Sequence, residues 1–254
     1  MREPLSLVVT TLNNAATLTR CLASAAWADE IVVLDSGSTD ATLAIAAEFN
    51  ARVFHESFKG YAAQKQSAID KARHRWVLLL DADEALAEGA RAAIEAALAA
   101  PQVAGFRLPR REQVFWTFNH PGVRLNTHLR LFDRDRVRMN AVPVHAAPET
   151  REATTTLRAA VFMHYGEPDI ATKVAKINAY SSGLVAHKRG RRRRFMAARL
   201  VLYPYVFFLR QYFGKRWFLD GWAGFINAVS AAYYVFLKYA KVLEKDREET
   251  SGEK

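Results

Sequence analysis

Two aspartates, Asp81 and Asp83, directly follow a continuous apolar segment, and their type and spacing predict metal chemistry. In an extended segment, residues i and i+2 point to the same side, so both carboxylates can reach one cation. Oxygen ligands favour Mg²⁺ or Mn²⁺ over zinc, and such an ion shares its coordination shell with phosphate oxygens. An isolated Asp-x-Asp is common by chance, but its position at a strand end strengthens the prediction of a phosphate-linked metal site.

A second polar segment, Asp35-Ser-Gly-Ser-Thr-Asp40, joins an apolar run to a helical pattern. The N–H groups at a helix start attract anions, and the Asp35 carboxylate can accept hydrogen bonds from a ribose or a base. The alternative is an ordinary strand–helix turn in which Ser38 or Thr39 caps the helix.

These residues must be positioned by the elements around them, and the pattern predicts an alternation of strands and helices. We expect strands at 5–11, 30–35, 52–55 and 76–81, and helices at 15–26, 39–49, 61–72 and 88–99. Continuous apolar strands separated by helices indicate an α/β fold with a mostly parallel sheet covered on both faces. The carboxyl ends of parallel strands share one edge, where ligands bind. Thr10, Thr11, Asp35, His55 and Asp81 are therefore expected to gather at that edge.

The rest of the chain changes character twice. Prolines punctuate short β-like runs over 101–165, which predict mixed sheet and loops that complete domain 1–165. Region 166–254 is predicted to be helical, with a basic run, His187 to Arg194, followed by aromatic segments at 195–209 and 217–237. The uncharged stretch 221–237 is shorter than the roughly 20 residues that a spanning helix needs. We expect helices that lie on a membrane; the alternative is a helical subdomain packed on the sheet.

Composition narrows the classes of protein. The net charge is +10, which suits an anionic membrane surface or nucleic acid. The only cysteine is Cys21, so an intrachain disulfide and a cysteine-based zinc site are both excluded. The start of the sequence lacks the apolar core and the cleavage site of a signal peptide, so we expect a cytoplasmic protein.

Residues 5–110 together resemble glycosyltransferase family 2, which has the GT-A fold, a Rossmann-like sheet. The resemblance rests on Leu7-Val-Val-Thr-Thr-Leu-Asn13, Ala28-Asp-Glu-Ile-Val-Val-Leu-Asp-Ser-Gly-Ser-Thr-Asp-Ala-Thr42, Gly60-Tyr-Ala-Ala-Gln-Lys65 and Leu80-Asp-Ala-Asp-Glu84. Later segments are similar to the lipopolysaccharide-core β-1,4-glucosyltransferase branch. They are Leu129-Arg-Leu-Phe132, Val144-His145, Phe218-Leu-Asp-Gly-Trp222 and Phe236-Leu-Lys-Tyr-Ala-Lys241.

The resemblance implies roles for individual residues. The implied donor-binding residues are Thr10, Thr11, Asn13, Asp35, Ser36, Lys65, Asp81 and Arg130. Of these, Lys65 and Arg130 are placed near the donor phosphates, and the others near the nucleoside or the metal. Asp83 is implied as the main metal ligand, with Asp81 in support.

The catalytic base is less clearly marked. Related sequences usually read Val-His-Glu, whereas this chain reads Val144-His145-Ala146, and the next carboxylate is Glu149. His145 is chemically suitable because its ordinary pKa lies near neutral. We expect either His145 or Glu149 to act as the base and, failing both, Asp133 or Asp135.

The predicted reaction is inverting transfer of a hexose such as glucose from a UDP-sugar, assisted by Mg²⁺ or Mn²⁺, to a lipid-anchored glycan of the lipopolysaccharide core. The protein would sit peripherally on the inner face of the cell membrane, as a monomer or an oligomer. One alternative is transfer to polyprenyl phosphate. Another is a nucleic-acid-binding module that uses Arg191–Arg194, but it leaves Asp35, Asp81 and Asp83 unexplained, so we expect no nucleic acid partner. A nucleotide-sugar sensor without activity is a further alternative.

Overall fold

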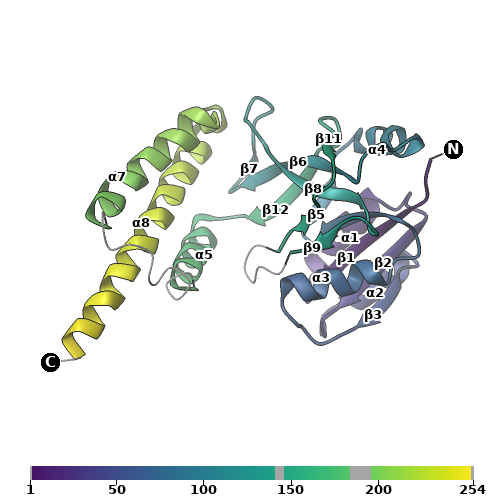
Figure 1. Ribbon diagram of the computed structural model, residues 1–254, viewed down its shortest axis with the longest axis horizontal. Coiled ribbons are helices and arrows are strands. Elements are labelled where there is room, and N and C mark those ends of the chain that lie inside the picture. The colour runs from purple at the N-terminus through teal and green to yellow at the C-terminus, as the bar shows by residue number, and fades with distance from the viewer. Residues whose placement is uncertain (1, 141–145, 184–195, 253–254) are drawn as a thin grey trace. The chain divides into compact units, whose positions relative to one another are not determined.

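The computed structural model describes residues 2–140, 146–183 and 196–252 (Figure 1). The chain divides into two compact units. The first comprises residues 1–111 and 125–165, and the second comprises residues 112–124 and 166–254. Residues 112–124, which the sequence pattern placed within domain 1–165, therefore group with the C-terminal helices.

The first unit begins with four parallel strands separated by helices. They are β1 (Leu5–Thr11), β2 (Glu30–Asp35), β3 (Arg52–His55) and β4 (Trp76–Asp81), in the spatial order β3-β2-β1-β4. The connecting helices are α1 (Ala15–Ser24), α2 (Thr42–Glu48) and α3 (Tyr61–Asp70). The predicted α/β alternation is confirmed, and the bounds of all four strands agree with the prediction.

The sheet changes direction after β4. It continues with β8 (Asn126–Asp133), β6 (Gly105–Val114), β12 (Phe162–Glu167) and β5 (Glu84–Leu86), which were predicted only as mixed sheet or not at all. β4 and β8 are antiparallel, as are β6 and β8 and also β12 and β5. Shorter strands are β11 (Thr154–Thr156), which lies parallel to β6, and the separate pair β9 (Arg138–Met139) and β10 (Pro148–Glu149).

Apolar side chains cover both faces of the parallel half because neighbouring residues of a strand point to opposite sides. Leu7 and Val9 of β1 pack with Leu18 and Leu22 of α1, in a core that also includes helix α4 (Ala90–Ala99). Val8, between them in sequence, belongs to a second core with side chains of α3. The prediction of helices on both faces of the sheet is confirmed.

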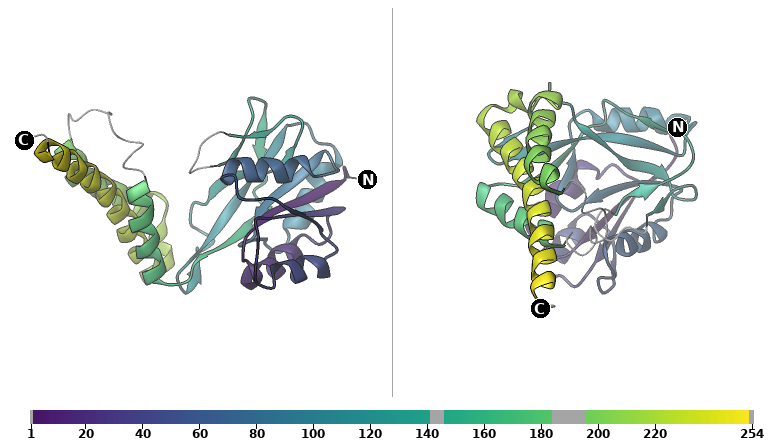
Figure 2. Two further views of the ribbon diagram at one scale, coloured as in Figure 1. Left: turned by 90° about the horizontal axis from the view of Figure 1, so that it is seen from below. Right: turned by 60° about the vertical axis from the view of Figure 1, so that its left-hand side comes forward.

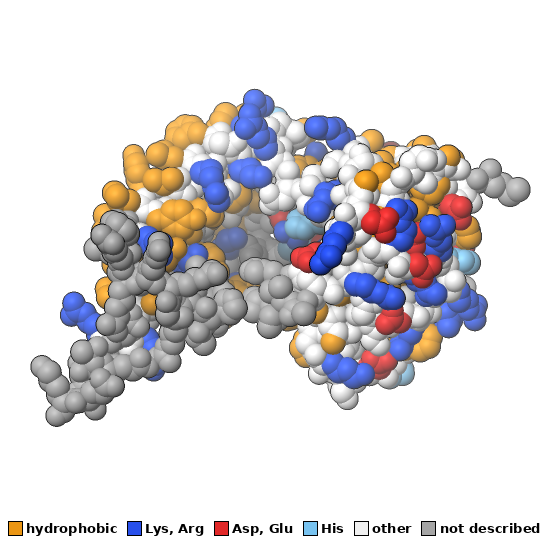
Figure 3. All heavy atoms as spheres, viewed as in Figure 1, with side chains coloured by type: hydrophobic (Ala, Val, Ile, Leu, Met, Phe, Trp, Pro, Cys, Tyr) orange, Lys and Arg blue, Asp and Glu red, His pale blue; other side chains and the backbone are white. Residues whose placement is uncertain are grey.

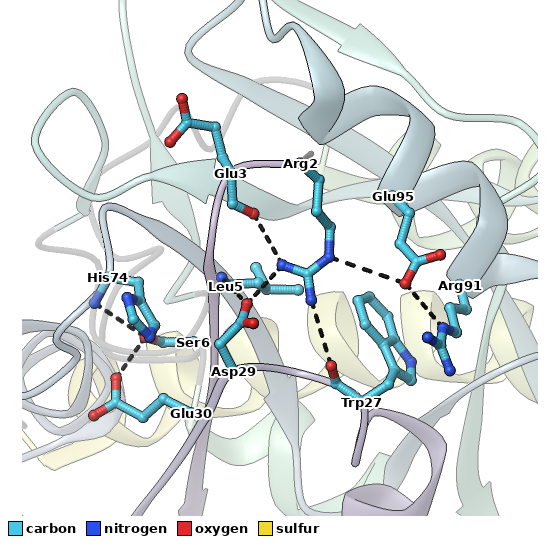
Figure 4. A network of polar contacts seen from close by, with 10 residues as sticks. All are labelled: Arg2, Glu3, Leu5, Ser6, Trp27, Asp29, Glu30, His74, Arg91 and Glu95. Carbon is cyan, nitrogen blue, oxygen red and sulfur yellow. Dashed lines mark hydrogen bonds and ion pairs between the residues drawn. The ribbon is translucent and has the colours of Figure 1, made fainter.

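Structural contacts occupy the end of the sheet at which β1 begins (Figure 4). Arg2 Nη1 lies 2.6 Å from Asp29 Oδ2, and the same oxygen accepts a 2.7 Å hydrogen bond from Leu5 N. The guanidinium of Arg2 also lies 5.5 Å from the centre of the Trp27 ring. These contacts hold the start of β1 against the segment before β2. This end of the sheet is therefore structural, and a ligand would bind at the opposite end.

The second unit is built from helices and one hairpin. Its elements are β7 (Thr117–Phe118), α5 (Ile170–Gly183), α7 (Met196–Leu209), the π-helical turn η1 (Arg210–Gly214), the 3₁₀ turn η2 (Trp217–Asp220) and α8 (Gly221–Gly252). α8 packs against both α5 and α7. Asp220 fixes the hairpin, because its carboxylate accepts hydrogen bonds from Asn119 Nδ2 at 2.8 Å and from His120 N at 2.6 Å.

α8 is longer than the predicted apolar segment 217–237 because the charged residues that follow continue the same helix. Across the described ranges, no helix is both long enough and apolar enough to cross a membrane. The basic run that contains Arg191–Arg194 lies outside the described residues.

Candidate active site

Polar residues of four neighbouring strands meet where the parallel strands end. Thr11 of β1 pairs in register with Asp35 of β2, and Asp35 pairs with His55 of β3. On the other side of β1, Thr10 pairs with Asp81 of β4. The register thus brings Thr10, Thr11, Asp35 and Asp81 together at one edge, where an open α/β sheet binds its ligands.

Hydrogen bonds join the two loops that leave this edge. Asn13, which has a positive φ of 53°, accepts a 2.8 Å bond from Thr39 N through Oδ1, and its own N–H donates to Ser38 Oγ at 2.8 Å. Asp40 accepts a 3.1 Å bond from Ala15 N at the start of α1. The β1–α1 and β2–α2 loops therefore form one preorganised wall beside the strand ends.

The Asp35 carboxylate is buried and shapes its own turn. It accepts hydrogen bonds from Gly37 N at 2.9 Å and Ser38 N at 3.0 Å, and His55 Nδ1 lies 3.4 Å away. Burial alone would raise the pKa of Asp35, but the hydrogen bonds from Ser38 and Gly37 outweigh it and lower the pKa. Asp35 is therefore ionised at neutral pH, and it stabilises the turn in addition to any contact with a nucleoside.

Ser36 and Lys65 connect helix α3 to the strand ends. The buried Gln64 donates hydrogen bonds of 3.2 Å to Ser36 Oγ and to Glu56 O, which fixes the first turns of α3 against the β2 loop. The next residue, Lys65, directs its ammonium group to the Asp81 carboxylate, with which it forms an ion pair.

Asp81 belongs to a cluster of four charged side chains, Lys65, Asp81, Glu84 and Arg130, of which Glu84 and Arg130 are buried. Arg130 Nη2 lies 3.1 Å from Asp81 Oδ2 and 2.6 Å from Glu84 Oε1, while Glu84 Oε2 accepts a 3.0 Å bond from Asp81 N. Arg130 therefore orients two carboxylates at once, and Glu84 fixes the backbone where β4 ends.

Charge and burial act in opposite ways on the two carboxylates of this cluster. Burial would raise the pKa of Asp81, but the positive charges of Arg130 and Lys65 hold it well below its usual range. Burial does raise the pKa of Glu84, because the charge of Arg130 opposes the shift only in part and Asp81 adds to it. The Asp81 carboxyl is thus firmly ionised, whereas ionisation of the Glu84 carboxyl depends on the charge of Arg130.

Asp83 has other contacts than Asp81. β4 ends at Asp81, and the chain turns at Ala82 and Asp83, so the rule for extended residues i and i+2 does not apply here. Asp83 Oδ2 lies 3.4 Å from His164 Nε2 of β12, and Asp83 O accepts a 2.9 Å hydrogen bond from Tyr165 N. β12 therefore holds Asp83 in place and adds an imidazole beside it.

The pair Asp83 and His164 fits a divalent cation that is shared with a ligand. In the described part of the chain, no group of three or more His, Cys, Asp or Glu side chains is placed to hold a metal ion. Mg²⁺ and Mn²⁺ sites commonly use one or two protein ligands and complete their shells with phosphate oxygens and water. A carboxylate and an imidazole at 3.4 Å suit such a site, and they do not suit a closed structural zinc site.

The candidate bases lie elsewhere. His145 is outside the described residues. Glu149 is exposed on β10 and accepts a 2.9 Å hydrogen bond from Asn140 Nδ2. Asp133 is buried in an ion pair with Arg75 at 2.6 Å. It pairs in register with Trp76 at the start of β4. Asp81 lies five residues further along β4, about 17 Å away. Asp133 is therefore structural.

Sequence reasoning missed His164, Gln64 and the role of Glu84. Glu84 was visible as the last residue of the Asp-Ala-Asp-Glu segment, and Gln64 as the neighbour of Lys65. His164 had no such signal, because its position depends on the antiparallel register that pairs it with Glu84.

A parallel sheet that turns antiparallel, with acidic and basic side chains at the parallel strand ends, is the arrangement of the GT-A class of glycosyltransferases. A model of "Glycosyl transferase family 2" matches residues 6–149. The chain belongs to this family and is a glycosyltransferase.

Individual relatives agree with this assignment. The chain is 33% identical to the "Lipopolysaccharide core biosynthesis glycosyltransferase LpsC" of Rhizobium meliloti (strain 1021), over 95% of this chain and 93% of the relative. It is 28% identical to an "Uncharacterized glycosyltransferase" of Rickettsia felis, over 95% and 90%. Among solved structures, the mannosyltransferase PcManGT from Pyrobaculum calidifontis, in complex with GDP-Man and Mn²⁺, superposes with a TM-score of 0.54. That match covers 96% of this chain and 88% of the other at 15% identity, so it supports the fold alone.

Proposed function

We propose that this protein transfers a hexose, such as glucose, from a UDP-sugar to a lipid-anchored glycan of the lipopolysaccharide core, with inversion and with Mg²⁺ or Mn²⁺. The observation that carries the proposal is the strand register, which places Asp35 and Asp81 on either side of β1 at one sheet edge. The relative named for lipopolysaccharide core biosynthesis, which aligns with nearly the whole chain, supports the acceptor class.

Each part of the donor has a proposed partner. The wall formed by Thr10, Thr11, Asn13, Asp35 and Ser36 would bind the nucleoside, because it offers fixed acceptors and backbone N–H groups. Lys65 and Arg130 would face the diphosphate. Asp83 would be the main ligand of the cation, with Asp81 in support and His164 beside it, and the cation would supply positive charge to the leaving diphosphate.

The reaction itself is a single displacement. The acceptor hydroxyl oxygen attacks the anomeric carbon, the bond from that carbon to the diphosphate oxygen breaks, and the base takes the hydroxyl proton. His145 and Glu149 remain the proposed bases, because both follow β9 and both carry groups that can accept a proton. Negative charge develops on the leaving diphosphate, and fixed cations stabilise it without needing a proton transfer.

A nucleotide-binding screen tests the proposal directly. The melting temperature should rise with UDP-glucose in the presence of Mn²⁺ and rise much less without the metal, because a ligand that binds only the folded state stabilises it. GDP-mannose is the comparison donor, because PcManGT was solved with it. Release of UDP that depends on added lipopolysaccharide-core acceptor would then show transfer.

Asp83→Asn should abolish the metal-dependent shift, and His164→Ala should weaken it. Asp70→Asn is the matched control, because Asp70 is an exposed aspartate of the same unit whose side chain contacts Gln66 and Arg138. If Asp83→Asn responds to UDP-glucose and Mn²⁺ as the unaltered protein does, the metal assignment is wrong. If no nucleotide sugar raises the melting temperature, the whole proposal is contradicted.

A further inference from the structure

One face of the second unit is apolar and exposed even though its helices pack together. α7 and α8 lie side by side (Figure 1). On α8, Ala223, Ala228 and Val235 are buried, whereas a separate stripe faces outward. That stripe consists of Trp222, Phe225, Val229, Tyr233 and Phe236. Its members are three or four residues apart, so they lie on one side of the helix.

α7 and the turn after it carry a second exposed stripe. It consists of Leu202, Val206, Leu209 and Phe213, and Val201, Tyr203 and Tyr205 of α7 are exposed as well. The two stripes together are called the α7–α8 apolar face. In Figure 3, hydrophobic side chains gather over the α7 and α8 part of the molecule, with Lys and Arg side chains beside them. Trp222 is 77% exposed, although an exposed tryptophan costs free energy in water. Apolar surface of this extent marks a site that another partner covers.

The charge beside the two stripes is mostly positive. Residues 196–236, which contain both stripes, carry four basic side chains and one acidic one, Asp220, and the acidic residues near the end of α8 begin only at Glu244. Asp220 is occupied by the hairpin residues Asn119 and His120. Arg199 and Arg210 are both exposed; Arg199 precedes the α7 stripe, and Arg210 lies between its members Leu209 and Phe213. An apolar face bordered by cations is complementary to acyl chains below anionic head groups.

We propose that the α7–α8 apolar face docks on an anionic lipid membrane with both helices parallel to its surface. This inference deepens the proposed function, since it names the surface through which the enzyme reaches a lipid-anchored acceptor. Tryptophan and tyrosine are suited to the head-group level, and arginine extends its charged end toward phosphates while its stem stays apolar. A second copy of the chain is a poorer partner, because a two-fold interface would bring two sets of these basic residues together.

Co-sedimentation with vesicles tests the apolar part of the proposal. The protein should bind phosphatidylglycerol–phosphatidylcholine vesicles strongly and pure phosphatidylcholine vesicles weakly. Trp222→Ser should lower the partition coefficient by about tenfold or more, because the indole no longer leaves water. Phe213→Ser should also lower it, whereas Phe58→Ser should not. The last two form a matched pair, since Phe213 is 59% and Phe58 is 54% exposed and Phe58 lies in the first unit.

Charge-neutralising variants in the same vesicle assay test the electrostatic part of the proposal. Arg199→Gln/Arg210→Gln should lower binding to the anionic vesicles about 25-fold at low salt, since each basic residue near the surface contributes about fivefold. The loss should shrink as salt screens the head groups. Arg151→Gln/Arg158→Gln removes two exposed arginines from the first unit and should leave binding unchanged.

Equal partition of the unaltered protein and Trp222→Ser would overturn the proposal, and so would equal binding to both vesicle types. A dimer in solution that Trp222→Ser converts to monomer, with no vesicle binding, would show that this face is a subunit interface instead. The melting shift with UDP-glucose, measured on the same variants without vesicles, separates the two proposals. A normal shift without vesicle binding overturns only the docking surface, and vesicle binding without any shift overturns only the proposed reaction.

Discussion

Replacing Arg130 by methionine should leave the buried carboxylate of Glu84 without its cation. The Arg130 side chain is only 7% exposed, and its Nη2 atom contacts both Glu84 and Asp81. Methionine retains an apolar stem against the Phe162 ring, so the main loss is the charge. Removing one partner of a buried ion pair costs about 3–5 kcal/mol, which is a large part of the stability of a typical domain.

The control is a second Arg–Asp ion pair, which has the same N–O distance but is exposed to solvent. Arg138 Nη1 lies 3.1 Å from Asp70 Oδ1, as Arg130 Nη2 does from Asp81 Oδ2, but the Arg138 side chain is 64% exposed. Exposed pairs contribute about 0–1 kcal/mol, so Arg138→Met should change the unfolding free energy little. Urea unfolding followed by far-ultraviolet circular dichroism at neutral pH measures both variants, and equal slopes with urea concentration would show that the comparison is valid.

The double variant Arg130→Met/Glu84→Gln tests whether the ionised Glu84 carboxylate causes the loss of stability in Arg130→Met. Glutamine cannot ionise, and its carbonyl oxygen can still accept the hydrogen bond from Asp81 N. The second substitution should therefore restore much of the stability lost in Arg130→Met.

The pH dependence of Arg130→Met follows from the raised pKa of Glu84. Burial raises this pKa in the folded protein, and removal of Arg130, which opposes the shift, raises it further. The folded state then takes up a proton at a higher pH than the unfolded state, whose glutamate pKa is about 4.3. Stability of Arg130→Met should therefore increase as pH falls from neutral toward that value, and the deficit relative to the unaltered protein should narrow.

Two results would refute this reasoning. One is an equal loss of unfolding free energy in Arg130→Met and Arg138→Met, since burial would then not decide the cost. The other is a double variant that is no more stable than Arg130→Met, since the ionised Glu84 would then not be the source of the loss.

Three further predictions follow from single residues. Asp35→Ala should weaken UDP binding in calorimetry and lower the unfolding free energy by about 1–3 kcal/mol, because the N–H groups of its turn lose their acceptor; unchanged affinity would make Asp35 purely structural. Glu149→Gln or His145→Ala, whichever removes the base, should cut turnover by about 10²–10⁴ with donor affinity nearly intact; if neither slows transfer, the base lies elsewhere. Burial raises the pKa of the Cys21 thiol, so iodoacetamide should modify it slowly in the folded protein and readily in urea, and rapid native modification would contradict its burial.

The parallel half of the fold could be predicted because its signals are local. Each of β1, β2, β3 and β4 is a short run dense in apolar residues that ends in a polar residue, and the ends of a parallel sheet coincide whatever the details of packing. The amino-acid pattern therefore suffices to assign Thr10, Thr11, Asp35 and Asp81 to one edge.

The remainder depends on contacts between distant segments. The register of β12 against β5 brings His164 beside Asp83, and nothing near either residue in the sequence indicates that pairing. The end of α8 at Gly252 was missed for a different reason. Lysine and glutamate are good helix formers, so the helix continues after its apolar pattern has ended.

The assembly of residues 112–124 into the second unit has a consequence for synthesis of the chain. Asn119 and Asp220 form a hydrogen bond across 101 positions of sequence. At typical elongation rates of about 5–20 residues per second, the hairpin emerges from the ribosome about 5–20 s before Asp220 emerges. During that interval Val114 and Phe115 lack the α8 side chains against which they later pack. A protein shortened at residue 165 would keep the hairpin in that unpartnered state permanently. The first unit should therefore be produced alone only if a short turn replaces residues 112–124.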